Sequence, residues 1–236
     1  MNKHTDSKFI IGDMFVDARD NKRYKKVKIG NQIWMAEDLK AATYADGEGL
    51  TLLPDNTSLY DFINLYDKGY FKRDVYANFS GSVVYPINDE GYYYTWAAVM
   101  NGSLSANDSP SNVQGICPDG WHVPSSAEFN ELLDFLKADY IKDKEGQALR
   151  SDYASLNDMD KGTNYYGFNA LAKGYHYSDF YGQTGEVANY WTTLQTDYES
   201  WGHYTQAYFF NIGWNYANIW PASKVEGRCV RCLQNQ

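Results

Sequence analysis

Hydrophobic positions change their spacing along the chain, and the first stretch has the spacing of strands. Between Phe15 and Leu39, apolar residues stand among charged ones. Turn residues interrupt them at 19–22 (RDNK) and at 30–31 (GN). Short apolar runs broken by such residues are typical of strands joined by tight turns. We therefore predict three short antiparallel strands near the start of the chain.

Two later segments have helical spacing. Residues 92–101 (YYYTWAAVMN) predict a short helix that ends before Gly102. Further on, Ser125 and Glu128 form an S-x-x-E capping box, which marks the start of a helix. Behind this box, apolar residues recur at the i, i+3, i+4, i+7 spacing of an amphipathic helix. These residues are Phe129, Leu132, Leu133 and Leu136.

The remaining chain predicts loops and strands. Residues 44–90 lose their periodicity, which predicts a long loop or insertion with one short helix near 58–66. After Asp158, short aromatic runs between glycines predict strands. These runs are 167–176, 190–194, 207–212 and 227–233. Because strands and helices do not alternate regularly, the pattern predicts an α+β fold.

Composition and charge exclude several classes of protein. The 236 residues are 44% hydrophobic and 22% charged, which is typical of a globular domain. With 21 Lys and Arg against 30 Asp and Glu, the formal charge is −9, so nothing favours nucleic acid or anionic lipid. No apolar stretch approaches the ~20 residues of a membrane span. The first eight residues are polar and show no secretory signal.

Catalytic and metal-binding motifs are absent from the sequence. The four histidines, His4, His122, His176 and His203, lack the spacing of a zinc site, and we expect His122 to pack within the local GWHVPS corner. Neither a nucleophile elbow nor a phosphate-binding or dinucleotide-binding loop occurs. We therefore expect a protein that is not an enzyme and needs no metal and no cofactor.

Three cysteines leave one thiol over in any pairing scheme. They stand at positions 117, 229 and 232, and their number does not decide the redox compartment. Cys229 and Cys232 form a C-x-x-C pattern, which some redox and metal sites use. Such redox pairs normally begin a helix, whereas the residues around this pattern resemble a terminal strand. A structural role is therefore the preferred interpretation.

The aromatic stretch between Tyr190 and Trp220 is the part of the sequence that says most about function. Trp191, Tyr208 and Phe210 fall within strand-like runs and are expected in the core. The other aromatic residues are interleaved with Asn, Gln, Thr and Ser, a mixture that suits sugar-stacking or protein-binding surfaces. The candidate ligand-binding residues are Tyr198, Trp201, His203, Tyr204, Trp214, Asn215, Tyr216 and Trp220.

Six ordered segments resemble one known family. They are 17–39 (DARDNKRYKKVKIGNQIWMAEDL), 91–100 (GYYYTWAAVM), 114–133 (QGICPDGWHVPSSAEFNELL), 167–176 (GFNALAKGYH), 190–193 (YWTT) and 230–233 (VRCL). Together they resemble the Fibrobacter succinogenes major paralogous domain over residues 13–233. The segment GWHVPSSAEF is also similar to a signature of the formylglycine-generating-enzyme-like branch of the C-type lectin fold.

The resemblance implies a fold and a domain organisation. It implies a C-type-lectin-like α+β domain with two main helices, small antiparallel sheets and long loops. A single domain would cover residues 13–236 after an N-terminal tail at 1–12. Residues 46–90 exceed the family's usual spacer, which implies an insertion. The family usually has a small residue at the position of Cys229, which implies a disulfide between Cys117 and Cys232 and leaves Cys229 free.

The resemblance also implies a location and three hypotheses of function. Family members are typically surface or exported bacterial proteins, often lipoproteins, so we expect a cell-surface or extracellular location. The first hypothesis is a carbohydrate-binding module that uses the aromatic stretch. A second is a protein-binding display domain, because residues 197–220 are similar in texture to the variable proteins of diversity-generating retroelements. A third is an enzyme related to formylglycine-generating enzymes, which use a copper-binding cysteine pair.

A calcium-dependent sugar site is not expected. Calcium-dependent lectins of this fold use an EPN or QPD triplet followed by WND, whose oxygens hold the cation. Neither triplet occurs, and Trp214-Asn215-Tyr216 lacks the Asp of the second motif. The expected partner is a glycan or a protein, and any bound Ca²⁺ would be structural or incidental.

Overall fold

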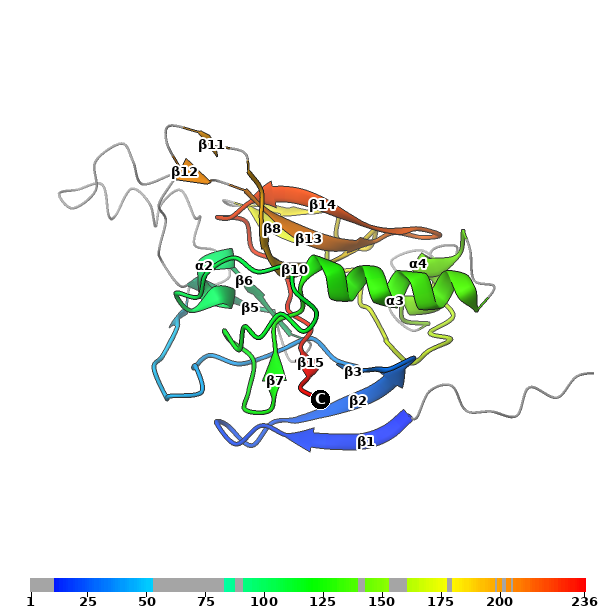
Figure 1. The fold of residues 1–236 in the computed structure, drawn as a ribbon, viewed down its shortest axis with the longest axis horizontal. Helices are drawn as coiled ribbons and strands as arrows, with labels where there is room; N and C mark the ends of the chain where they lie inside the picture. The colour runs from blue at the N-terminus through cyan, green and yellow to red at the C-terminus, as the bar shows by residue number, and fades with distance from the viewer. Residues whose placement is uncertain are drawn as a thin grey trace, which may run out of the picture.

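The computed structural model describes residues 11–52, 83–87, 91–139, 143–152, 161–177, 180–197, 199–200, 203–204 and 206–236. Few helices and mostly antiparallel sheets make it an α+β protein, as predicted (Figure 1). The described helices are α2 (Trp96–Met100), α3 (Ser126–Ala138) and α4 (Glu145–Leu149). The strands are β1 (Ile11–Val16), β2 (Arg23–Ile29), β3 (Gln32–Met35), β4 (Thr51–Leu52), β5 (Val83–Ile87), β6 (Gly91–Tyr94), β7 (Trp121–His122), β8 (Tyr175–Tyr177), β9 (Phe180–Gly182), β10 (Ala188–Gln195), β11 (Glu199–Ser200), β12 (His203–Tyr204), β13 (Gln206–Ile212), β14 (Ala217–Ser223) and β15 (Leu233–Gln234).

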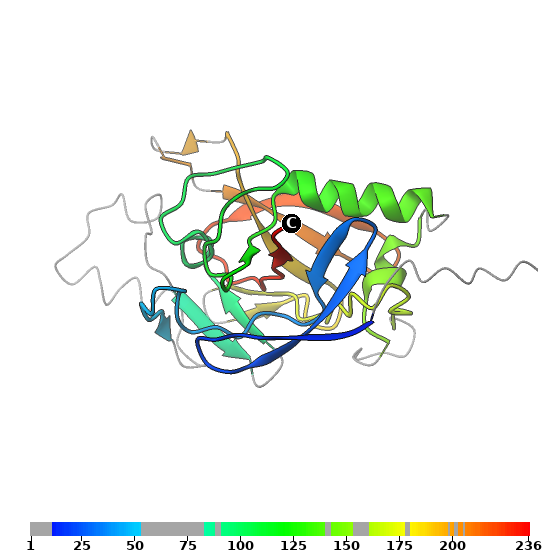
Figure 2. The ribbon, with the colours of Figure 1, turned by 60° about the horizontal axis from the view of Figure 1, so that its bottom comes forward.

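The first sheet joins the two ends of the described chain. Its strand order is β1-β2-β3-β15-β7, and the three predicted N-terminal strands are antiparallel neighbours. Leu233 of the last strand pairs with Trp34 on one side and with His122 on the other. Figure 2 shows the C-terminal end beside the blue strands. Residues about 200 positions apart therefore meet at this sheet.

The second sheet carries the aromatic stretch. Its order is β10-β13-β14, and Tyr190, Phe210 and Ile219 are paired across the three strands. Helix α3 covers this face, with the rings of Phe129 and Phe210 stacked at 4.4 Å between centroids. The capping box at Ser125 and Glu128 is present, so the prediction of this helix from sequence is confirmed.

A buried cluster of charges ties the C-terminal segment to the core. Asp38 forms ion pairs with Arg231 and with Lys173, the latter at 3.1 Å from Nζ to Oδ2. The hydroxyl of Tyr190 donates to Asp38 Oδ1 at 3.1 Å. Burial alone would raise the pKa of Asp38, but the two cations hold it below its ordinary value. Asp38 is therefore a buried carboxylate that needs both partners.

The prediction of a helix over 92–101 was too long. Residues 91–94 form strand β6, which pairs with β5. The helix begins only after Thr95, whose side chain accepts a hydrogen bond from the Ala98 amide. It ends at Asn101, which has a left-handed backbone, as the following glycine had suggested. Consecutive tyrosines favour a strand, and the cap at Thr95 sets the boundary.

Several predicted strands and loops were also wrong. Only the end of 167–176 is a strand, because Gly167, Asn169 and Gly174 take left-handed backbone conformations that interrupt extended structure. In 227–233, residues 227–229 make single bridges to three different segments, and only Leu233 enters a named strand. Elements that were not predicted include β4 and β5 within residues 44–90, β14 within the candidate ligand region, and the short helix α4. The predicted helix at 58–66 lies outside the described residues.

The cysteines occupy two different parts of the core. A disulfide joins Cys117 to Cys232, the pairing that the resemblance implies, across a separation of 115 residues. Cys229 is a buried free thiol in the other hydrophobic cluster, and its burial raises its pKa. Of the described helices, none is both long and apolar enough to span a membrane.

Candidate functional site

The turn between β13 and β14 exposes several candidate ligand-binding residues. Trp214 and Tyr216 are each 44% exposed, and Trp220 on β14 is 53% exposed. Asn215 is also exposed. We name as the hairpin surface the exposed and half-buried residues Asn211, Trp214, Asn215, Tyr216, Asn218 and Trp220.

Two rows of side chains cross the second sheet on the face opposite α3. One row is aromatic, because Trp191 pairs with Phe209 and Phe209 pairs with Trp220. The adjacent row consists of amides, because Asn189 pairs with Asn211 and Asn211 with Asn218. Both rows are buried at β10 and open to solvent at β14.

The amide row has donor and acceptor groups that make no hydrogen bond with the described residues. Asn211 Nδ2 donates to Asn218 Oδ1 at 3.2 Å, which leaves the Oδ1 of Asn211 and the Nδ2 of Asn218 without a described partner. Side chains at alternate positions of a strand share a face, so Asn218 and Trp220 of β14 stand on the same side. An aromatic plane next to amide groups is suited to a ligand with both apolar faces and hydroxyl groups.

Two glycines fix the position of the turn. A Cβ on Gly213 would lie 2.3 Å from the ring of Tyr216, so the ring rests directly on the glycine. A Cβ on Gly146 of α4 would lie 2.2 Å from the Gly213 carbonyl oxygen. Figure 1 shows the turn beside α4. Helix α4, which the sequence did not predict, therefore packs directly against the turn that carries the hairpin surface.

The structure does not gather all the predicted site residues. His203 and Tyr204 form β12, which precedes β13 and so lies at the end of the sheet opposite the turn (Figure 1). The seven residues of β13 separate these ends by roughly 20 Å, at ~3.3 Å per residue. Tyr198 and Trp201 lie outside the described residues. Trp214, Asn215, Tyr216 and Trp220 remain, and all four are exposed on the turn or on β14.

Two of the three residues of this stretch that were predicted to lie in the core do so. Trp191 and Phe210 are fully buried. Tyr208, by contrast, is only half-buried, and Pro221, its register partner on β14, is exposed.

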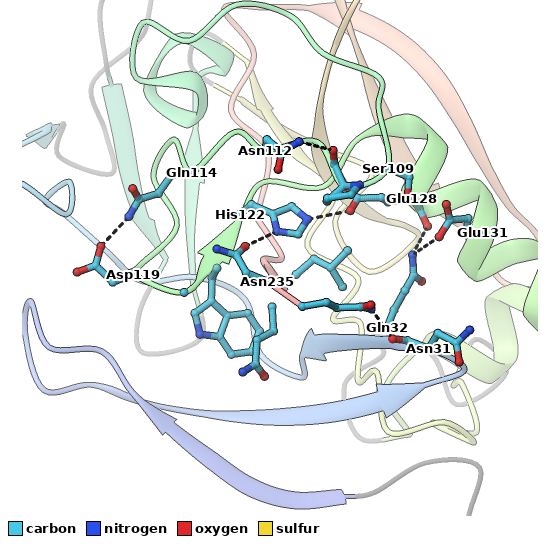
Figure 3. A pocket seen from close by; sticks show the side chains of 16 residues that line it. Asn31, Gln32, Ser109, Asn112, Gln114, Asp119, His122, Glu128, Glu131 and Asn235 are labelled. Carbon is cyan, nitrogen blue, oxygen red and sulfur yellow. Dashed lines mark hydrogen bonds and ion pairs between the residues drawn. The ribbon is translucent and has the colours of Figure 1, made fainter.

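A pocket lies at the first sheet and shares no lining residue with the hairpin surface. It has a volume of about 750 Å³. The ends of β3, β7 and β15, the loop before β7 and the first turns of α3 enclose it (Figure 3). We name it the amide pocket, after the Asn and Gln residues in its wall: Asn31, Gln32, Asn112, Gln114, Gln234, Asn235 and Gln236.

Sequence reasoning missed the amide pocket for a clear reason. Its wall combines residues 31–32, 109–122 and 233–236, which only the pairing of β15 with β3 and β7 brings together. No local spacing reports such a pairing. The single local signal is the concentration of amides at the C-terminal end, Gln234-Asn235-Gln236.

His122 and Glu128 form a buried pair in the wall of the amide pocket. Nε2 of His122 lies 2.8 Å from Oε1 of Glu128, and Nδ1 lies 2.6 Å from Oδ1 of Asn235. The other carboxylate oxygen of Glu128 accepts from the Ser125 amide. Burial alone would lower the pKa of His122, but the hydrogen bond and charge of Glu128, with Asn235, raise it above its ordinary value. His122 therefore packs within the local corner, as expected, and also makes a charge-assisted hydrogen bond with Glu128.

Neither site has the ligand set of a metal centre. Within the described part of the chain, no three His, Cys, Asp or Glu side chains are grouped so that they could hold a metal ion.

Comparisons with known proteins bear on the family alone. No curated protein and no solved structure matched the chain. One family model, described as the Fibrobacter succinogenes major domain, matches residues 27–234. This match includes the first sheet apart from β1 and the start of β2, the whole second sheet, helices α2 to α4, the hairpin surface and most of the amide pocket. The chain therefore belongs to the Fibrobacter succinogenes major domain family.

Proposed function

We propose that the protein is a non-catalytic binding module with a C-type-lectin-like fold, located at the cell surface or outside the cell. Its ligand is a carbohydrate, bound by the hairpin surface. One observation carries this proposal. Trp220 on β14 is 53% exposed, and its neighbours on the same face are the hydrogen-bonded amides of Asn211 and Asn218.

The chemistry of the hairpin surface suits a sugar. A pyranose ring presents an apolar face of C–H groups and a rim of hydroxyls. An exposed indole contacts the apolar face at little entropic cost, and amide groups both donate to and accept from hydroxyls. Tyr216 directly precedes β14 and Trp220 lies within it, so the chain between them spans up to roughly 13 Å, at ~3.3 Å per residue. This length accommodates more than one sugar ring.

The cysteines support a non-catalytic role. Formylglycine-generating enzymes need a reactive cysteine pair, whereas here Cys117 and Cys232 are joined and Cys229 is buried. A thiolate rather than a thiol is the reactive and metal-binding form, and the raised pKa of Cys229 disfavours it.

A glycan array, probed with and without a calcium chelator, tests the proposal. Specific binding should survive the chelator, and Trp220→Ala should abolish it. Leu104→Ala is the matched control, because Leu104 is 87% exposed outside both sites. Binding that requires calcium, or that survives Trp220→Ala, would contradict the proposal.

A blank array would favour the second candidate, a protein-binding display surface. The Tyr, Trp and Asn side chains of the hairpin surface also suit a protein partner. Sibling genes that differ only within residues 197–220 would then support a variable protein of the retroelement type, and identical siblings would exclude it.

A further inference from the structure

We infer that the amide pocket is a second binding site, and that its ligand is an organic cation carrying an ammonium or guanidinium group. The inference does not depend on the proposed function, because the pocket and the hairpin surface share no residue.

The charges in the wall favour a cation over an anion. Asp119, Glu128 and Glu131 line the pocket, and neither Lys nor Arg is among its lining residues. His122 is the only base in the wall, and its contact with Glu128 neutralises that pair locally. Asp119 and Glu131 then leave a net negative charge, and both are exposed to solvent. Figure 3 shows them on opposite sides of the pocket.

Hydrogen bonds within the wall use donors of four side-chain amides and leave amide oxygens available to a ligand. Gln32 donates to the Glu128 carbonyl and to Glu131, Asn112 to the Pro110 carbonyl, Gln114 to Asp119, and Gln236 to the Asn31 carbonyl.

Several amide oxygens in the wall therefore have no donor. The side-chain oxygens of Asn112, Gln114 and Gln236 accept no hydrogen bond from the described residues. Oε1 of Gln234 is buried and likewise has no partner there. Ammonium and guanidinium groups are donors without acceptors, so they complement such a wall. Phosphates and carboxylates offer acceptors and would meet like charges.

Part of the pocket wall is buried and hydrogen-bonded within the protein. Gln32, His122 and Glu128 are each at most 7% exposed and are held by hydrogen bonds on more than one side. A volume of about 750 Å³ is within the range of sites for small ligands. Its polar wall differs from the apolar wall of most such sites, which indicates a hydrophilic ligand.

Two probes test the inference and distinguish the source of the cation. They are spermidine, a free polyamine, and Nα-acetyl-arginine amide, which represents a peptide side chain. Nα-acetyl-citrulline amide is the neutral match of the second probe. Calorimetric titration should detect spermidine, the arginine probe or both, and should detect no citrulline binding. Spermidine alone would indicate a small amine, and arginine alone a peptide.

Charge-neutral variants locate the binding. Asp119→Asn and Glu131→Gln should each weaken cation binding about fivefold, the factor for loss of one exposed ion pair. Asp134→Asn, on the exposed side of α3 and outside the pocket, makes the same change of net charge and should have no effect. Trp220→Ala should also have none, so this test and the glycan test fail separately. Absence of binding by both probes, equal binding of citrulline, or an equal effect of Asp134→Asn would overturn the inference.

Discussion

Trp220 and Phe209 face each other on adjacent strands, but their environments are opposite. Phe209 is 8% exposed, and the guanidinium of Arg228 lies 3.6 Å from its ring centre. Trp220, its direct partner in the register, is 53% exposed. The same row of aromatic side chains therefore begins in the core and ends at the surface.

Alanine substitutions should separate these two roles. Phe209→Ala should lower the free energy of unfolding by about 3–5 kcal/mol, because it removes a buried ring and leaves a cavity. Trp220→Ala should change it by about 0.5 kcal/mol or less, as for an exposed residue. Urea denaturation measures both. A loss of several kcal/mol in Trp220→Ala would place this residue in the core and remove it from the ligand surface.

Helix α3 shows what the sequence can predict. Its capping box at Ser125 and its apolar stripe from Phe129 to Leu136 are local signals, and both indicate the same helix. The N-terminal strands were predictable for the same reason, because tight turns at 19–22 and 30–31 join neighbours in sequence. Helix caps, hydrophobic spacing and turn residues, all local in the sequence, were sufficient to predict these elements.

Strand β14 and the segment 227–233 show where prediction from sequence ends. Pro221 and the polar residues of β14 indicate a loop, yet the strand forms because β13 pairs with it through seven residues. Conversely, residues 227–233 were predicted to form a strand, but residues 227–229 make single bridges to three separate segments. In both cases a distant partner decides the structure. The hairpin surface was found because its aromatics exceed what packing needs, whereas the amide pocket has no such excess.

Gly146→Ala should disturb the hairpin surface. Replacing Gly with Ala inside a helix ordinarily stabilises it by about 0.5–1 kcal/mol. Here the new Cβ would lie 2.2 Å from the Gly213 carbonyl, so the turn that carries Trp214 and Tyr216 must move. We expect a lower melting temperature and weaker glycan binding. Gly49→Ala is the control, since a Cβ there meets nothing within 4 Å. Higher stability of Gly146→Ala would show that α4 does not support the turn.

The three cysteines should respond differently to reagents. Loss of the Cys117–Cys232 bond, by Cys117→Ser with Cys232→Ser, should cost about 4–5 kcal/mol of stability, the value expected for a loop of this length. Cys229 should resist alkylation in the folded protein and react on unfolding, because it is buried and its pKa is raised. Mass spectrometry of alkylated peptides reports both the bond and the thiol. Rapid alkylation of Cys229 under native conditions would contradict its placement in the core.

Asp38→Asn should be strongly destabilising. The substitution keeps the size of the side chain but leaves Arg231 and Lys173 without their buried counter-charge. Breaking a buried pair in this way costs about 3–5 kcal/mol. Asp20→Asn is the control, because the Asp20–Lys22 pair is exposed and should contribute about 1 kcal/mol or less. Comparable losses in the two variants would mean that the buried cluster contributes no more than a surface pair.

Stability should fall as the pH rises through the pKa of His122. In the folded protein Glu128 holds this pKa above the ordinary value of 6.5, so the native state binds the proton more tightly than the unfolded state. The stabilisation is complete below about pH 6.5 and is lost as the pH passes the folded-state pKa. Glu128→Gln should reduce this dependence, while its amide can still accept the Ser125 N–H and preserve the capping box.

Denaturation at about pH 5.5, below the ordinary pKa of histidine, and at about pH 8.5, above it, measures the difference for both proteins. The other histidines contribute equally to the wild type and to Glu128→Gln, so the change between the two proteins isolates the His122–Glu128 pair. We expect the wild type to lose more stability than Glu128→Gln between these pH values. Equal losses would show that His122 is neutral in the folded protein, and that its contact with Glu128 is an ordinary hydrogen bond.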